Sequence, residues 1–382
     1  MTLGSLAGRL TVWLRLPGGD VATTLRDKFF GCIAGVHIGS AMAAPVEGWS
    51  YDRIEAEHGT LDRFLPYHHY RGTTDWVREP GTTEDGVERQ KLIITAIMRK
   101  QDRITAEDLR AVWVTDMNPN GAGVVSEPFE GPLLAMAKTP VPARDIGRYC
   151  DYSGLVSFAR SCHPVGLINA GDPLHALEDV LEVGQIYQAS NSRGLQWASV
   201  TAVAIAEATK PSASVDSVLG TVLDTCGGFS ERFVQDARVA GELERALALT
   251  SGCCDLRDLR ATFDTMYGGY GIPYAHSYAN EVVTKAICIF RMVKGNLKDA
   301  IVAGVNLGRD TDCATAVAAG IAGALTGSAG LPEAWVAQVD RAAQMNPYTN
   351  TQRTLAEHAD GLYDAFTERL AGMRAYVEEM GM

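Results

Sequence analysis

The segment from Val305 to Gly327, VNLGRDTDCATAVAAGIAGALTG, constrains the fold more than any other part of the chain. Its second part, Cys313–Leu325, is a run of small, mostly apolar residues without charge. Glycine lowers helix propensity, so such a run forms a stable helix only where other elements surround it. We therefore predict a central buried helix with Asp310 and Asp312 at its N-terminal end.

Two carboxylates at the start of a buried helix have two interpretations. They cap the helix, because aspartate accepts backbone N–H groups there and complements the helix dipole. Alternatively, they bind a hard cation, because a carboxylate does not stay charged in a protein interior without a partner. This segment by itself is compatible with both interpretations.

A second oxygen-rich cluster favours the metal interpretation. Gly81–Arg89 reads GTTEDGVER, and an apolar helical continuation, Leu92–Met98, follows it. Thr83, Glu84 and Asp85 therefore open another helix. Two such helix starts together carry the oxygen donors of a binuclear Mg²⁺ or Mn²⁺ site.

With these two clusters the chain resembles the ADP-ribosylglycohydrolase family, which includes dinitrogenase reductase-activating glycohydrolase and ADP-ribosyl hydrolases. That family pairs a Thr-Asp-Asp-Thr motif with a late Gly-Gly-Asp-x-Asp-Thr motif around two metal ions in an all-α fold. Gly31–Glu47, GCIAGVHIGSAMAAPVE, is similar to the family's first helix and the acid after it. The resemblance, which covers roughly residues 24–335, implies a compact all-α fold of orthogonally packed helices. Because no repeat, linker or composition break divides the chain, we expect one domain over residues 24–382, preceded by an N-terminal extension, residues 1–23.

The resemblance also implies the residues of the site. Glu47 is expected beside the scissile glycosidic bond, and Asp85 and Asp310 are the other expected catalytic residues. Two divalent ions, Mg²⁺ or Mn²⁺, are the expected cofactors. Their expected ligands are Thr83, Glu84, Asp85, Asp310, Asp312 and Cys313.

Several positions depart from the family pattern. Ser40, Glu84 and Gly86 stand where Asp, Asp and Thr are usual, and Cys313 stands where Thr is usual. The Cys313 thiol has three possible roles. It is a thiolate ligand that selects softer ions, or it is neutral and does not bind the metal, or its presence indicates that the site has lost its second ion. We favour the second role, because a neutral thiol replaces a neutral hydroxyl without a change of charge.

Two loops and one arginine are the candidate contacts to substrate. Asn118–Val125 is either a plain turn or a loop that holds a diphosphate with backbone N–H groups. Tyr267–Tyr278 offers tyrosine faces to a sugar or base, or packs them on the core. The candidate substrate-binding residues are Gly121, Gly123, Val124, Tyr270 and Arg309.

The remaining patterns predict helices at 83–99, at 104–116 with Thr105 as N-cap, and in the C-terminal region. Close approach of another backbone is predicted at Gly31, Gly35 and Gly39. Residues 51–80 are predicted to be turn-like, and residues 212–266 to form two amphipathic helices.

Charge and composition argue against two classes of partner. The net charge of the 382 residues is −12, and no basic patch supplies the attraction that nucleic acids need. No apolar run is seen to reach the ~18 residues that span a bilayer, so we expect no membrane partner.

Eight cysteines without a C-x-x-C pair indicate free thiols in a reducing cytoplasm. We expect a monomer or a small homo-oligomer.

Two functions of different classes follow. The first is a metal-dependent hydrolase that cleaves the anomeric N- or O-glycosyl bond of an ADP-ribosyl or smaller ribosyl or nucleoside-type substrate, free or linked to protein. The alternative is a catalytically silent relative that acts as a binding or structural protein. The carboxylates of Asp310 and Asp312 favour the enzyme, whereas Ser40, Gly86 and Cys313 favour the alternative.

Overall fold

The computed structural model describes residues 23–68, 77–118, 130–232, 238–268 and 275–382. Within these ranges the chain forms helices and two isolated β-bridges but no β-strand, which confirms the all-α prediction. The α-helices are α1 (Leu25–Ala43), α2 (Tyr51–His58), α3 (Asp85–Lys100), α4 (Ala106–Asp116), α6 (Glu130–Ala137), α7 (Ala143–Ile146), α8 (His163–Ile168), α9 (Pro173–Val183), α10 (Arg193–Ala208), α11 (Val215–Arg232), α12 (Arg238–Leu249), α13 (Leu256–Tyr267), α14 (Ala279–Met292), α15 (Leu297–Val305), α16 (Thr311–Thr326), α17 (Glu333–Met345) and α18 (Leu355–Glu379). Short 3₁₀ helices lie at η1 (Ala44–Val46), η2 (Gly147–Tyr149), η3 (Gly184–Ile186) and η4 (Ala275–Ser277).

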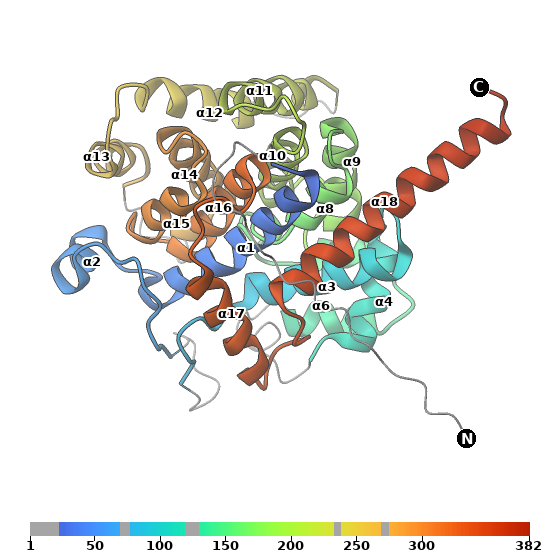
Figure 1. The fold of residues 1–382 in the computed structure, drawn as a ribbon, viewed down its shortest axis with the longest axis horizontal. Helices are drawn as coiled ribbons and strands as arrows, with labels where there is room; N and C mark the ends of the chain where they lie inside the picture. The colour runs from blue at the N-terminus through green and yellow to red at the C-terminus, as the bar shows by residue number, and fades with distance from the viewer. Residues whose placement is uncertain (1–22, 69–76, 119–129, 233–237, 269–274) are drawn as a thin grey trace.

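The centre of the fold is helix α16, which packs against α1, α10, α14 and α15 (Figure 1). Every residue from Thr311 to Ala324 is buried. The small side chains of this helix allow neighbours on all sides, and those neighbours compensate for its weak intrinsic helicity. The predicted central buried helix is confirmed.

Helices α1 and α16 approach closely because glycines face each other across their interface. A Cβ atom on Gly35 would lie 2.6 Å from the carbonyl oxygen of Ala319, and one on Gly39 would lie 2.7 Å from the Thr315 side chain. Glycine is therefore required at these positions, as the sequence predicts. The two helices run in opposite directions, so the end of α1 lies beside the start of α16.

Two predictions about local structure are wrong. Residues 51–58 form helix α2 rather than a turn, because the Ser50 hydroxyl accepts the Arg53 backbone N–H at 3.3 Å and Arg53 pairs with Glu57 one turn later. Residues 212–266 contain three helices rather than two. The Asp255 side chain caps α13 and so starts a helix separate from α12.

One helical stretch, Leu25–Val46, is long and apolar enough by length and composition to cross a membrane, contrary to the sequence expectation. Of its most apolar window, 89% is buried inside the fold. This stretch is the core helix α1 with η1, so its apolar residues contact other helices of the same chain.

Three histidines from different helices are buried in the core. His37 donates from Nε2 to Gln90 Oε1 at 3.0 Å, and Gln90 Nε2 donates to His163 Nδ1 at 3.2 Å. His358 lies 5.6 Å from His37 between ring centroids, and neither of its nitrogens has a hydrogen-bond partner in the described residues. Burial lowers the pKa of His37 and of His163 to about 3 and the pKa of His358 well below its ordinary value.

These histidines predict that the fold is destabilised by acid. Their folded-state pKa values lie below the unfolded value of about 6.5, so the unfolded chain binds more protons and stability is lost as the pH falls below that value. We expect His358→Phe to reduce the loss of unfolding free energy between pH 7 and pH 5 by about 2 kcal/mol. Chemical denaturation at both pH values measures it. A His358→Phe variant that keeps the parent's pH dependence would contradict the assignment.

Candidate metal centre

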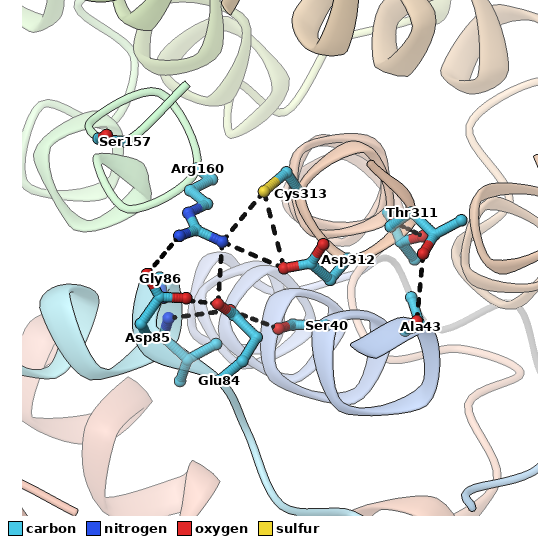
Figure 2. A network of polar contacts seen from close by, with 12 residues as sticks. Ser40, Ala43, Glu84, Asp85, Gly86, Ser157, Arg160, Thr311, Asp312 and Cys313 are labelled. Atoms are coloured by element: carbon cyan, nitrogen blue, oxygen red, sulfur yellow. Dashed lines mark hydrogen bonds and ion pairs between the residues drawn. The ribbon is translucent and has the colours of Figure 1, made fainter. Parts of the chain in front are cut away.

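The two predicted carboxylate clusters meet in the structure where the starts of α3 and α16 face each other (Figure 2). Glu84 and Asp85 come from the start of α3, and Asp312 and Cys313 come from the first turn of α16. All four residues are buried. The antiparallel packing of α1 against α16 adds Ser40, near the end of α1, to the same place.

Asp310 is buried, and no described residue forms a hydrogen bond with its carboxylate. It occupies the N-cap position of α16, yet its side chain makes no capping hydrogen bond. Neither of its carboxylate oxygens has a hydrogen-bond partner among the described residues, and its exposed fraction is 3%. One oxygen of Asp312, Oδ1, is in the same state. The capping interpretation is therefore wrong for Asp310.

The donor atoms at the start of α16 fit a divalent cation. One ligand atom each from Asp310, Asp312 and Cys313 lies within 4.8 Å of the others. Unpaired carboxylate oxygens in a buried position are costly unless a cation compensates them, and oxygen donors suit Mg²⁺ and Mn²⁺. The residues present thus fit the metal that the family resemblance implies.

Glu84 is the residue that caps a helix here. Its carboxylate accepts the backbone N–H groups of Gly86 at 2.8 Å and Val87 at 3.3 Å. The Ser40 hydroxyl donates to the same carboxylate at 2.7 Å. The sequence left capping and metal binding as alternatives, and the structure divides them between the two clusters. Glu84 caps α3, whereas Asp310 at the start of α16 has no hydrogen-bond partner among the described residues.

A guanidinium group lies between the two clusters. Arg160 Nη1 donates to Glu84 Oε2 at 2.9 Å, to Asp312 Oδ2 at 3.1 Å and to Cys313 Sγ at 3.0 Å. Its Nη2 donates to Asp85 Oδ2 at 2.6 Å. Arg160 belongs to no motif recognised in the sequence. The signal was a single charge in the otherwise apolar and small-residue stretch 154–168.

Glu47 is brought to the cluster by backbone pairing. The Gly48 N–H donates to the Arg309 carbonyl, and the Arg309 N–H donates to the Trp49 carbonyl, both at 2.7 Å. Gly308 makes this close approach feasible, because it has φ +82° and a Cβ there would lie 2.7 Å from the Tyr51 nitrogen. Glu47 as a residue is partly exposed, but its carboxyl group is surrounded by protein. This burial, together with the neighbouring Asp310, raises the pKa of the Glu47 carboxyl well above its usual range.

The acids of the cluster repel one another's charge. Burial, opposed by Arg160, raises the pKa of Glu84 to about 7. Burial, Glu47 and Asp310 raise the pKa of Asp312 well above its usual value. Burial likewise raises the pKa of the Cys313 thiol, which supports a neutral thiol. Arg160 alone therefore does not compensate the negative charge gathered here.

The other predicted site residues are placed as follows. Thr83 is buried next to Glu84, and its carbonyl accepts from Arg78 at 3.3 Å. The Arg309 side chain forms a two-bond ion pair with Glu281 of α14. Its role as a substrate contact stays a prediction. The other substrate-binding candidates, Gly121, Gly123, Val124 and Tyr270, lie outside the described residues.

The fold and this cluster define a class: an all-α protein that gathers carboxylates from two helix starts in its core. The chain belongs to the ADP-ribosylglycohydrolase family, whose family model matches residues 22–371. It is 23% identical over 331 residues to "Uncharacterized protein YegU" of Escherichia coli (strain K12). The matched region covers 84% of this chain and 94% of that protein.

A solved structure, "ADP-ribosylglycohydrolase-related protein complex", has the same fold. It matches with a TM-score of 0.60 and 15% identity over 90% of this chain and 99% of that chain. At this identity the likeness shows the fold alone, and it agrees with the predicted multi-helix architecture.

Proposed function

We propose that this protein is a divalent-metal-dependent glycoside hydrolase that cleaves the anomeric bond of an ADP-ribosyl or smaller ribosyl or nucleoside-type substrate. The observation that carries the proposal is the buried Asp310 carboxylate, which has no hydrogen-bond partner among the described residues and lies beside Glu47 and Asp312. Family membership supports a glycohydrolase-type activity. The substrate, the bond type and the metal dependence are the parts that we add.

Asp310 and Asp312 would hold the ion, because both oxygens of Asp310 and Oδ1 of Asp312 have no hydrogen-bond partner in the part of the chain that the structure describes. When bound, a divalent ion would supply positive charge that orients ribose hydroxyls and a water molecule. Hydrolysis at an anomeric carbon also needs a carboxyl group beside the scissile bond that moves a proton. Among the five clustered acids, Glu47 is the partly exposed one, whereas Glu84, Asp85, Asp310 and Asp312 are all buried. Glu47 is therefore the acid that a substrate reaches from solvent.

The second candidate function is a catalytically silent binding protein. It is favoured by the ion pairs of Arg160, which engage oxygens of Glu84, Asp85 and Asp312. The two candidates differ in one measurable property, the turnover of a ribosyl substrate in the presence of Mg²⁺ or Mn²⁺.

The test is hydrolysis of ADP-ribosyl-arginine, ADP-ribosyl-serine and simple nucleosides with each metal. We expect Glu47→Gln to lower turnover by about 10²-fold, because the amide keeps the shape of the side chain but does not transfer a proton. Mn²⁺ affinity, measured by calorimetry, should stay close to that of the parent. Glu57→Gln on the surface of α2 is the matched control and should hydrolyse like the parent. A parent that binds metal but turns over none of these substrates would support the binding protein instead.

The proposed location is the cytoplasm. All eight cysteines lie in described parts of the chain and all are free thiols. Cys253 and Cys254, which are adjacent in sequence, are among them. Eight free thiols in one chain support a location in a reducing compartment.

A further inference from the structure

We infer that the guanidinium of Arg160 is a built-in cation that takes the place of a second metal ion, so that the site binds a single divalent ion at Asp310 and Asp312. The inference rests on the metal site of the proposed function and extends it to the number of ions. It concerns a residue of this chain that no motif brought to attention.

The first observation is the position of the guanidinium. Nη1 contacts both Glu84 of α3 and Asp312 of α16, at 2.9 and 3.1 Å. An ion that joined these two carboxylates would have to occupy the space that Nη1 fills. Nη2 at the same time binds Asp85, so the carboxylates at the start of α3 are joined to α16 through one side chain (Figure 2).

The second observation is the space made for this side chain. A Cβ on Gly86 would lie 2.7 Å from both Cδ and Nε of Arg160. Any larger residue at position 86 would therefore displace the guanidinium. The first turn of α3 is shaped to admit Arg160, and Glu84 caps that turn while it binds Nη1.

The third observation is that the backbone that carries this side chain is fixed in a hydrogen-bonded turn. Arg160 has an exposed fraction of 7% and lies on a compact turn in which its own N–H donates to the Val156 carbonyl at 3.3 Å. The Ser161 hydroxyl donates within that turn to the Ser157 carbonyl at 3.0 Å. An arginine stays charged at every physiological pH, so the cation is permanent.

The cluster is therefore divided into two halves. Glu84, Asp85 and one oxygen of Asp312 share Arg160, whereas Asp310 and the other oxygen of Asp312 have no partner among the described residues. A fixed organic cation serves the first half. The second half keeps unpaired, buried oxygens that point to one exchangeable ion.

The experiment counts Mn²⁺ ions per chain. Calorimetry on the full chain should give one Mn²⁺ per parent molecule, and electron paramagnetic resonance should show an isolated ion without exchange coupling. Arg160→Met removes the charge and keeps much of the length, so we expect it to bind two ions, with the spectrum of a coupled pair. Arg160→Lys keeps a positive charge and should stay at one. Arg103→Met, which removes a partly buried ion pair with Asp179 elsewhere in the fold, is the matched control and should also stay at one.

Each outcome has a defined meaning. Two ions in the parent, or a single ion in a folded Arg160→Met variant, would overturn the inference and leave the proposed hydrolase intact. A parent that binds no Mn²⁺ would overturn both. If Arg160→Met does not fold, the ratio in the parent and in Arg160→Lys decides: one ion in both supports the built-in cation, and two in either rejects it.

Discussion

Replacement of Asp310 by asparagine is expected to abolish tight Mn²⁺ and Mg²⁺ binding and to lower hydrolysis by about 10³-fold or more. Both oxygens of this carboxylate are buried and unpaired in the described structure, so no internal cation takes the place of a lost metal ligand. Asparagine keeps the size and removes the charge. Calorimetric titration with each ion and a turnover assay with the best ribosyl substrate measure the two effects.

The control for this variant is an aspartate that also starts a helix but serves only as a cap. Asp255 accepts the Asp258 backbone N–H at 3.0 Å at the start of α13, on the surface. Asp255→Asn should keep the cap, since asparagine is an equally good N-cap residue, and should bind Mn²⁺ like the parent. If Asp310→Asn bound Mn²⁺ and Mg²⁺ as tightly as the parent, the assignment of Asp310 as a metal ligand would be wrong.

The largest effect on stability is expected at Gly323, in the last turn of α16. A Cβ there would overlap the backbone of Gly31 on α1, including its carbonyl group. Backbone cannot move aside as the end of a flexible side chain can. We therefore expect Gly323→Ala to lower the unfolding free energy by about 4 kcal/mol, although alanine favours a helix over glycine by about 1 kcal/mol. Urea denaturation of the purified variant measures the change.

A matched substitution separates packing from helix propensity. Gly220 lies within α11 and has no atom within 4 Å of the place where a Cβ would be. Gly220→Ala should raise the unfolding free energy by about 1 kcal/mol, the gain that propensity alone predicts. If Gly323→Ala also raised the unfolding free energy, the contact between α1 and α16 would be looser than the structure indicates.

The sequence was sufficient for the features that depend on local pattern and composition. The small apolar run after Asp312 has no stable place outside a crowded core, so α16 could be predicted as the centre. The spacing of Gly31, Gly35 and Gly39 likewise predicted a close helix contact. The acids at both helix starts could be assembled into one site because the family resemblance joined them.

The features that sequence reasoning missed depend on contacts between distant segments. Whether Asp310 or Glu84 caps its helix is decided by hydrogen-bond geometry, which residue types do not specify. Arg160 contacts Asp85 and Asp312, which lie 75 and 152 positions away in sequence. No local pattern encodes such a partnership. Gly86 was visible as a departure from the family pattern, but its reason, the space it leaves for Arg160, needed the fold.

The pairing of α1 with α16 also affects how the chain is made. Gly31 and Gly323 lie near opposite ends of the sequence, yet a Cβ on Gly323 would lie only 2.0 Å from the Gly31 carbonyl oxygen. A chain that leaves the ribosome from its N-terminus exposes the apolar surface of α1 until almost all of the protein has been synthesised. Closing so long a loop also slows the search for this contact. During translation, α1 therefore needs transient partners or chaperones that shield its apolar surface until α16 has been synthesised.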